Sequence, residues 1–236
     1  MKDFLFKSPT KVKFGAGTSF QLYEIFEEMG VKKPFFVTGK HVGKTDEFAK
    51  IIASLEEKGY SVQLFTDTQP DPPIDVCDAA AQVLKDSGCD VCVAVGGGSV
   101  IDTAKAMCML VTNEGSVKEY LFGGSKTVEN PSLPLIAVPT TAGSGSEVSA
   151  ASVITDEEND IKLSVSHEYL MPKFAVIDPL QQIHMPAFIT ATTGMDALTH
   201  AIESYVSLNA NPFSDAYGEM AIRLIGENIR AAVHDP

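Results

Sequence analysis

The chain has 236 residues, of which 44% are hydrophobic and 21% charged, and this is the composition of an ordinary globular protein. Its formal net charge of −13 argues against a nucleic acid or an anionic membrane as partner, because both call for basic surface. The longest apolar runs are strand-sized, and the opening residues MKDFLFKSPT lack the apolar core of a secretory signal. We therefore expect a cytoplasmic protein.

Short β-rich runs alternate with helix-like segments in the first 180 residues. We predict strands at 34–39, 61–67, 90–96, 133–141 and 173–179. Helical patterns lie between them, near 17–29, 43–58, 72–87 and 99–112. This alternation predicts an α/β fold, a Rossmann-like domain with a parallel sheet and helices on both of its faces. The strands are apolar throughout, which suits burial from both sides.

The pattern changes twice in the second half of the chain. Residues 152–168 form two alternating runs around DEEND, which predicts a hairpin on the side of the domain. From about 186 to the end the pattern is helical. We therefore predict an α/β domain at 1–182 and a helical part at 183–236.

Four cysteines raise the question of a thiolate metal site, since two of them form C-x-x-C at 89–92. The spacing lies at the start of a predicted strand, where positions three apart face opposite sides, and no second cysteine pair completes a site. We interpret all four as reduced core residues. They are Cys77, Cys89, Cys92 and Cys108.

A glycine run joins a predicted strand to a predicted helix in DVCVAVGGGSVIDTAKAM. Gly96, Gly97 and Gly98 allow a tight turn and a close approach of backbone to ligand. Ser99 stands where the helix begins, so that free N–H groups and the positive end of the helix dipole suit a pyrophosphate. A tight turn without a ligand would also fit this segment taken alone. The usual G-x-G-x-x-G fingerprint is absent.

A second loop rich in small and hydroxyl residues leaves another strand, in AVPTTAGSGSEVSAASV at 137–153. Thr140 and Thr141 end that strand, and open α/β sheets bind ligands at the carboxyl ends of their strands. The loop could also serve flexibility alone. Two such loops on neighbouring strand ends favour a nucleotide cleft.

Asp196 and His200 stand four apart in ATTGMDALTHAIESY, so a helix would present both from one face. A carboxylate and an imidazole spaced in this way can bind a divalent metal. A pair of this kind found alone is more often structural, and His167, His184 and the late His234 lie outside any motif.

Three segments together, GGGSVIDTAK, PTTAGSGSEVSAASVITD and TTGMDALTHAIESYVS, resemble the iron-containing (group III) alcohol dehydrogenase family, in the dehydroquinate synthase-like superfamily. The resemblance spans essentially the whole chain. It implies an N-terminal dinucleotide-binding domain, an all-helical C-terminal domain and a metal and substrate site in the cleft between them. It also implies a homo-oligomer, most simply a dimer.

The resemblance assigns roles to the matched positions. The pyrophosphate and the neighbouring ribose would be held by Gly97, Gly98, Ser99 and Asp102. The rest of the cofactor site would be lined by Thr140, Thr141, Ser149, Lys162 and Leu180. Asp196 and His200 match two of four metal ligands; the other two are histidines that the family places beyond residue 236. We therefore expect the chain to correspond to the first three-fifths or so of a family enzyme.

The function implied is hydride transfer between NAD(P) and a small primary alcohol or diol, or the reverse reduction of an aldehyde. Fe²⁺ would act as a Lewis acid, and the nitrogen and oxygen ligands would also accept Zn²⁺. Two alternatives stay open: a zinc polyol dehydrogenase or lyase of the superfamily, such as glycerol dehydrogenase or dehydroquinate synthase, and a catalytically inactive nucleotide-binding fragment. We expect chain 1–236 by itself to be inactive or weakly active.

The cofactor preference depends on residues 39 and 40. NAD-preferring relatives typically end the first strand of the sheet in an aspartate that binds the adenine ribose and repels a 2′-phosphate. Here FFVTGKHVGK places Gly39 there, followed by Lys40 and His41. We therefore expect NADP(H) to be accepted at least as well as NAD(H), although Gly39 could also merely ease the turn.

Overall fold

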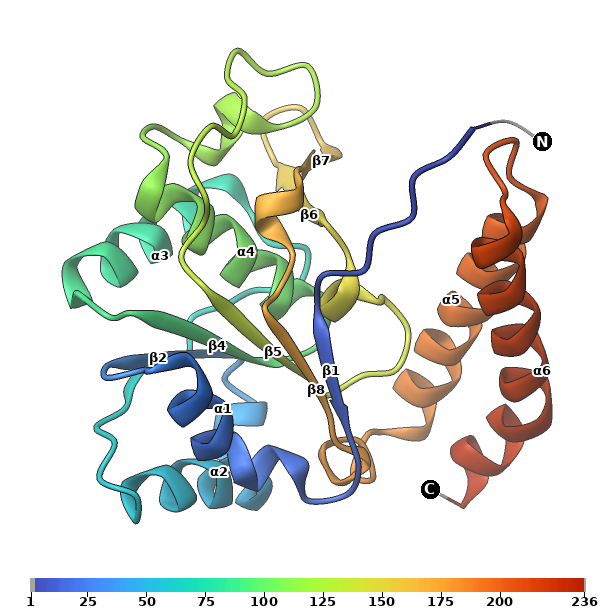
Figure 1. Cartoon of the computed structure of the whole chain (residues 1–236), viewed down its shortest axis with the longest axis horizontal. Helices are drawn as coiled ribbons and strands as arrows, with labels where there is room; N and C mark the ends of the chain where they lie inside the picture. The colour runs from blue at the N-terminus through green and yellow to red at the C-terminus, as the bar shows by residue number, and fades with distance from the viewer. Residues whose placement is uncertain (1–2, 236) are drawn as a thin grey trace.

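The computed structural model describes residues 3–235. A parallel sheet of six strands carries helices on both faces, and two long helices stand beside it (Figure 1). This arrangement confirms the predicted α/β fold followed by a helical part. None of the helices within 3–235 combines the length and the apolar composition needed to cross a bilayer.

The strands of the sheet follow the order β1-β8-β5-β4-β2-β3, and every pair in it is parallel. Their bounds are β1 (Lys11–Phe14), β2 (Pro34–Thr38), β3 (Gln63–Phe65), β4 (Val91–Gly96), β5 (Leu135–Pro139) and β8 (Phe174–Ile177). The last five lie within the five predicted strands. The first, β1, was not predicted, because KVKF is a short and mostly exposed edge strand with charged residues at alternate positions.

Two hydrophobic cores lie on opposite faces of the sheet, because successive strand residues point to opposite sides. Along β4, Val91, Val93 and Val95 belong to one core, and Cys92 and Ala94 to the other. Helices α1 (Leu22–Met29) and α2 (Asp46–Glu56) cover the first core, and α3 (Ile74–Ser87) and α4 (Gly98–Thr112) cover the second. All four helices occur where the sequence predicted them.

The chain reverses its direction across the sheet at β2. It passes outward from β2 to the edge strand β3 and then returns to β4 on the other side of β2. Helices α2 and α3, which make these two connections, lie on opposite faces. The carboxyl ends of β2 and β4 therefore flank a topological switch point, where open α/β sheets form a ligand crevice.

The predicted hairpin is present as β6 (Ala151–Asp156) and β7 (Ile161–Ser166), which pair antiparallel outside the main sheet. Ile154 of β6 and Val165 of β7 are buried in the core that α3 and α4 cover. The hairpin thereby fixes the segment that follows β5 against α4.

The helical part consists of α5 (Ala187–Val206) and α6 (Pro212–His234), which pack against each other along their length (Figure 1). Asn211 caps α6 by accepting hydrogen bonds from the backbone N–H groups of Phe213 and Ser214. The domain boundary predicted at 182/183 falls between the short 3₁₀ turn at Pro179–Gln181 and the start of α5.

The N-terminal arm leaves β1 and crosses to the helical part (Figure 1). Phe6 stacks on Phe213 with ring centroids 4.4 Å apart, and Phe4 meets the same ring edge-on at 6.0 Å. Thr10 holds the base of the arm by donating to the carbonyl oxygen of Pro172 at 2.8 Å. The arm thus joins the sheet edge to the first turn of α6.

Candidate functional site

The glycine loop lies between β4 and α4, as predicted. Gly97 is the N-cap residue of α4, and its carbonyl oxygen accepts the N–H groups of Val100 and Ile101. The first N–H groups of the helix point out of its N-terminus and have no partner within it, which suits an anion. Gly96 has to be glycine for a separate reason, since a Cβ there would lie 2.6 Å from the Val100 side chain.

The second loop packs directly on the first. The backbone N–H of Thr140 donates to the carbonyl oxygen of Gly96 at 3.0 Å. A Cβ atom at Gly97 would come within 3.2 Å of the Thr141 side chain, and one at Gly98 within 2.9 Å of Ser144. The absence of side chains in the first loop therefore allows the two loops to meet, and both stand at the carboxyl edge of the sheet.

Asp102 and Ser149, which the resemblance places at the cofactor, make their hydrogen bonds within the protein. Asp102 is 8% exposed; its carboxylate accepts from the Ser146 hydroxyl and from the Val153 N–H at 3.1 Å. Burial raises the pKa of Asp102, and the Ser146 hydrogen bond opposes that rise. In this structure Asp102 attaches α4 to the second loop, so the cofactor contact assigned to it remains a prediction.

Lys105 is a buried cation that the sequence analysis did not single out. It is 0% exposed, and its ammonium donates to the carbonyl oxygens of Ser149 and Ala151 at 2.8 and 2.7 Å and to the Ser149 hydroxyl at 3.0 Å. Three acceptors match the three donors of a protonated amine. Burial lowers the pKa of Lys105 to about 8, and Asp102 and Glu147 favour the charged form. Lys105 therefore positions the second loop from beneath.

A short chain of contacts connects Lys162 to the glycine loop. The Lys162 ammonium pairs with the Asp71 carboxylate at 2.6 Å, and the Asp71 N–H donates to the Ser99 hydroxyl at 3.3 Å. Asp71 has a positive φ of 49°, which lets the segment before α3 turn toward α4. Two predicted cofactor residues from distant parts of the sequence, Lys162 and Ser99, thereby stand on either side of one aspartate.

Three other predicted cofactor residues, Thr140, Thr141 and Leu180, line one pocket of about 270 Å³. His41 and His184 line it as well, and His184 stands 3.5 Å from the Glu47 carboxylate. Leu180 is fixed there because its N–H donates to the buried carboxylate of Asp178 at 3.0 Å. The pocket adjoins the loop after β2, on the side of the sheet where the cofactor was predicted.

Gly39 and Lys40 lie at the switch point, at the end of β2. A Cβ atom at Gly39 would lie 3.9 Å from Val100 in the first turn of α4, so residue 39 adjoins the glycine loop. The sequence analysis missed a third residue here. The Asp67 carboxylate, which follows β3, lies 3.1 Å from the Lys40 ammonium, and Gly39 and Asp67 form an isolated β-bridge. A carboxylate is therefore present beside Lys40.

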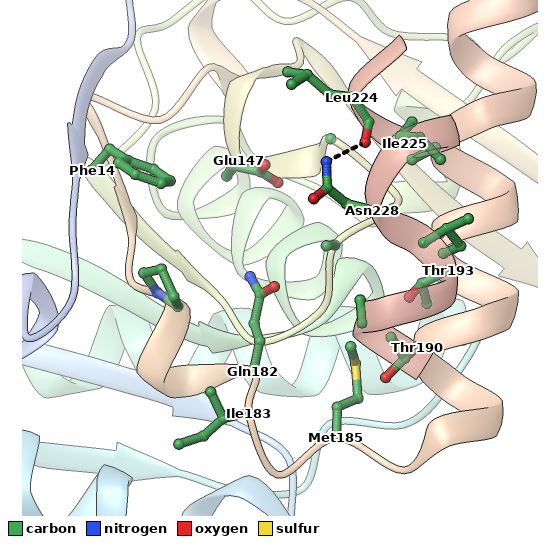
Figure 2. Close-up of a pocket in the computed structure, with 18 residues that line it drawn as sticks. Phe14, Glu147, Gln182, Ile183, Met185, Thr190, Thr193, Leu224, Ile225 and Asn228 are labelled. Atoms are coloured by element: carbon green, nitrogen blue, oxygen red, sulfur yellow. Dashed lines mark hydrogen bonds between the residues drawn. The ribbon is translucent and has the colours of Figure 1, made fainter. Parts of the chain in front are cut away.

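A larger cleft of about 750 Å³ separates the sheet domain from α5 and α6 (Figure 2). Its walls are mostly apolar, with Gly143 and Gly145 from the second loop on one side and Thr193, Leu224 and Ile229 from the helices on the other. Glu147 reaches into it from the second loop (Figure 2), and burial raises the pKa of that carboxyl. Sequence analysis did not single out Glu147, although an ionisable group in an apolar cleft is typical of functional sites.

Asp196 and His200 stand together on α5, as their spacing predicted. The Asp196 carboxylate lies 3.7 Å from Nε2 of His200, which is close enough for one divalent ion to contact both. Nδ1 of His200 is 3.4 Å from the carbonyl oxygen of Gly143 in the second loop. Within residues 3–235 no cluster of three or more His, Cys, Asp or Glu side chains could hold a metal, so these two residues do not make a closed site.

A sequence model described as iron-containing alcohol dehydrogenase matches residues 9–179, and one for the C-terminal region of the Fe-containing family matches residues 190–236. The chain belongs to the iron-containing alcohol dehydrogenase family. The resemblance seen in its motifs is thereby confirmed, and the α/β and helical parts of the structure correspond to the two matched regions.

Relatives within the family are similar over nearly the whole chain. Long-chain-alcohol dehydrogenase 1 of Geobacillus thermodenitrificans is 40% identical over 93% of this chain and 55% of its own length. NAD-dependent methanol dehydrogenase of Bacillus methanolicus is 37% identical over 95% of this chain and 58% of its own length. The structure of a sulfoacetaldehyde reductase from Bifidobacterium kashiwanohense in complex with NAD⁺ superimposes with a TM-score of 0.94 at 32% identity. The match covers 100% of this chain and 62% of the reductase chain. The chain thus spans less than two thirds of each relative.

Proposed function

We propose that this chain supplies the cofactor-binding half of an NAD(P)-dependent alcohol dehydrogenase. The observation that carries the proposal is the contact between two glycine-containing loops at the carboxyl ends of β4 and β5. That contact depends on the bare backbone of Gly97 and Gly98, and it leaves the N-terminus of α4 available for the pyrophosphate of NAD or NADP. Gly97 and Gly98 therefore fit a dinucleotide, because no side chain covers the N-terminus of α4 at these two positions.

The reaction that we propose is the oxidation of a small primary alcohol or diol to an aldehyde, and its reverse. A hydride leaves the alcohol carbon for the nicotinamide, and the hydroxyl proton goes to solvent. The residues of this chain bind and orient the dinucleotide, and the apolar cleft between the second loop and α5 restricts water near the reacting carbon. The substrate alcohol would enter through this cleft.

The family implies Fe²⁺, and Zn²⁺ would suit the same ligand types, because both accept imidazole and carboxylate. Bound metal supplies Lewis-acid polarisation of the substrate oxygen. Asp196 and His200 fit two coordination positions, but two ligands do not fit a complete centre. A homodimer and a cytoplasmic location are further parts of the proposal, which rest on the family and the composition.

Direct binding of the reduced cofactor to chain 1–236 tests the proposal. The chain contains no tryptophan, so the emission of NADH can be followed without indole excitation. Saturable binding, confirmed by calorimetry, is expected. If neither NADH nor NADPH binds at millimolar concentration, the two loops do not form a dinucleotide site.

A catalytically inactive nucleotide-binding fragment is the second candidate function, and the two-ligand metal set favours it. An alcohol-dependent assay of NAD(P)H absorbance, run with Fe²⁺ or Zn²⁺ added in excess, separates the two. Metal-dependent turnover under these conditions, even when weak, supports the dehydrogenase, and cofactor binding without any metal-dependent turnover supports the fragment. A zinc enzyme of the glycerol dehydrogenase type would be distinguished by activity with Zn²⁺ and polyols only.

A further inference from the structure

The segment at the carboxyl end of β3 carries a carboxylate, whereas the end of β2 has none. Rossmann-like domains place a carboxylate beside the glycine loop, where it accepts hydrogen bonds from the adenine ribose hydroxyls. In this chain that position at the end of β2 is Gly39, which has no side chain. From the sequence alone, the absence of a carboxylate at residue 39 predicts that the 2′-phosphate of NADP(H) would be tolerated.

The fold brings a carboxylate close to the end of β2 from the neighbouring strand. β3 pairs in parallel with β2, and beyond the paired residues Gly39 and Asp67 form a β-bridge. The next residue, Thr68, also adjoins Gly39: a Cβ at Gly39 would lie 3.6 Å from its hydroxyl, which donates to the Thr38 carbonyl oxygen at 3.0 Å. These contacts hold the backbone of Asp67 beside that of Gly39, so the Asp67 carboxylate lies near the end of β2.

Asp67 also neutralises the cation that would attract a 2′-phosphate. Its carboxylate lies 3.1 Å from the Lys40 ammonium, and the two side chains are 68% and 73% exposed, so both are accessible to a ligand. A phosphate that pairs with Lys40 must therefore approach a carboxylate at hydrogen-bonding distance from the same ammonium. Ribose hydroxyls carry no charge and can donate to Asp67 instead.

We infer that Asp67 is a specificity-determining residue that selects NAD(H) over NADP(H), with Lys40 as its ion-pair partner. This inference rests on the proposed function, because it assigns the adenine ribose to the switch point between β2 and β4. It reverses the preference expected from residues 39 and 40 alone. The physical reason is that residues 39–41 include no carboxylate, whereas strand pairing brings that of Asp67 to within 3.1 Å of the Lys40 ammonium.

Calorimetric titration of chain 1–236 with NADH and NADPH tests the inference, using the parent, Asp67→Asn, Lys40→Ala and the double variant. We expect the parent to bind NADH at least about tenfold more tightly than NADPH, which is about 1.4 kcal/mol. Asp67→Asn should strengthen NADPH binding by about tenfold and change NADH binding by no more than about threefold. In the double variant this gain in NADPH affinity should be lost, because Lys40→Ala removes the ammonium that would pair with the 2′-phosphate.

Glu24→Gln is the matched control. Glu24 pairs with Lys13 of β1 at 2.6 Å, and β1 lies at the edge of the sheet opposite to β3. The substitution removes one negative charge from an ion pair far from the switch point, so it should leave the ratio of the two dissociation constants unchanged. A similar change in Glu24→Gln would show that net charge alone sets the preference.

The outcomes are separable. A parent that binds NADPH as tightly as NADH, or an Asp67→Asn variant with an unchanged ratio, overturns the role of Asp67 and leaves the dinucleotide site intact. Binding of neither cofactor overturns the proposed function itself. Circular dichroism of each variant shows whether a lost signal comes from unfolding.

Discussion

A Cβ atom at Gly98 would lie 2.9 Å from the Ser144 side chain, so this glycine serves the contact between two loops as well as the approach of a ligand. The two roles cannot be told apart from a single substitution. They can be separated by removing the neighbour, because Ser144→Gly clears the space that a new side chain would enter. Gly98 and Ser144 therefore provide a paired test at the level of single residues.

We expect Gly98→Val to weaken NADH binding by more than about tenfold, because the side chain blocks the phosphate approach. Gly98→Val combined with Ser144→Gly should stay equally weak, while Ser144→Gly alone should bind within about threefold of the parent. Calorimetry gives all four dissociation constants. Recovery of binding in the double variant would mean that Gly98 serves loop packing only.

Lys105 predicts a pH dependence of stability. Its pKa is lowered by burial from 10.5 to about 8 in the folded chain. Between these values the unfolded chain binds a proton that the folded chain has released, so the contribution of Lys105 to the unfolding free energy rises with pH. The gain between pH 8 and 10.5 is about 3 kcal/mol. Below pH 8 both states are protonated and the contribution is constant.

Urea denaturation of the parent and of Lys105→Met over this pH range measures that contribution as a difference. The comparison is needed because burial raises the pKa of Cys77 to about 12, which lowers stability as pH rises above the thiol's ordinary range. Lys85→Met, at an exposed lysine of α3, is the control and should follow the parent. A parent-minus-variant difference that is flat or falls with pH would contradict the assigned role of Lys105.

At the level of elements, the second loop and α5 meet backbone to backbone. A Cβ at Gly143 would lie 2.5 Å from the carbonyl oxygen of Thr193, an atom that cannot move without moving the helix. Gly226, in the middle of α6, is exposed and has no atom within 4 Å of a Cβ. The two glycines are a matched pair, since only the first lies in a contact between elements.

We expect Gly143→Ala to push α5 away from the loop and to make the connection at 178–187 at least about threefold more sensitive to limited proteolysis, as expected for a sub-global opening. Gly226→Ala should instead stabilise the chain by ~0.5–1 kcal/mol through helix propensity. Timed digestion and urea denaturation measure the two effects. Equal proteolysis rates for Gly143→Ala and the parent would show that the loop does not hold the helix.

Elements buried on both faces could be predicted from the sequence, and exposed edges could not. The strands β4 and β5 are continuous apolar runs, whereas β1 is four residues long and has Val12 and Phe14 exposed. The glycine loops were predicted because their residues are contiguous. Asp67 and Lys105 were missed, because their partners lie 27 and more than 40 residues away and are brought together by strand pairing and helix packing.

At the level of the whole molecule, the sheet domain contains both predicted cofactor loops, whereas the helical part, as described up to residue 235, contributes Asp196 and His200 to the predicted metal site and forms no cluster of three or more metal-binding side chains. Several large apolar side chains of α5, α6 and the turn between them are also exposed. They include Phe188, Val206, Leu208 and Tyr217. We therefore expect chain 1–236 to retain cofactor binding but to lack metal-dependent turnover.

We expect purified chain 1–236 to bind NADH but to hold less than stoichiometric Fe²⁺ or Zn²⁺ and to show no alcohol oxidation above a protein-free blank. Two protein ligands leave the remaining coordination positions to water, which is too few for a tight site. Metal analysis after gel filtration and NAD⁺ reduction with ethanol or 1,3-propanediol measure both quantities. Robust turnover with one tightly bound metal per chain would show that other residues complete the site.

The aromatic contact between Phe6 and Phe213 restricts how the helical part can move. The covalent connection enters α5 at Ala187, at one end of the helix pair, and the arm meets the turn into α6 at the other end (Figure 1). A rigid body held at one point can rotate about three axes, and one held at two points can rotate about only the line between them. Once the contact between Gly143 and Thr193 is broken, opening of the 750 Å³ cleft is thereby limited to rotation about the line through these two attachments.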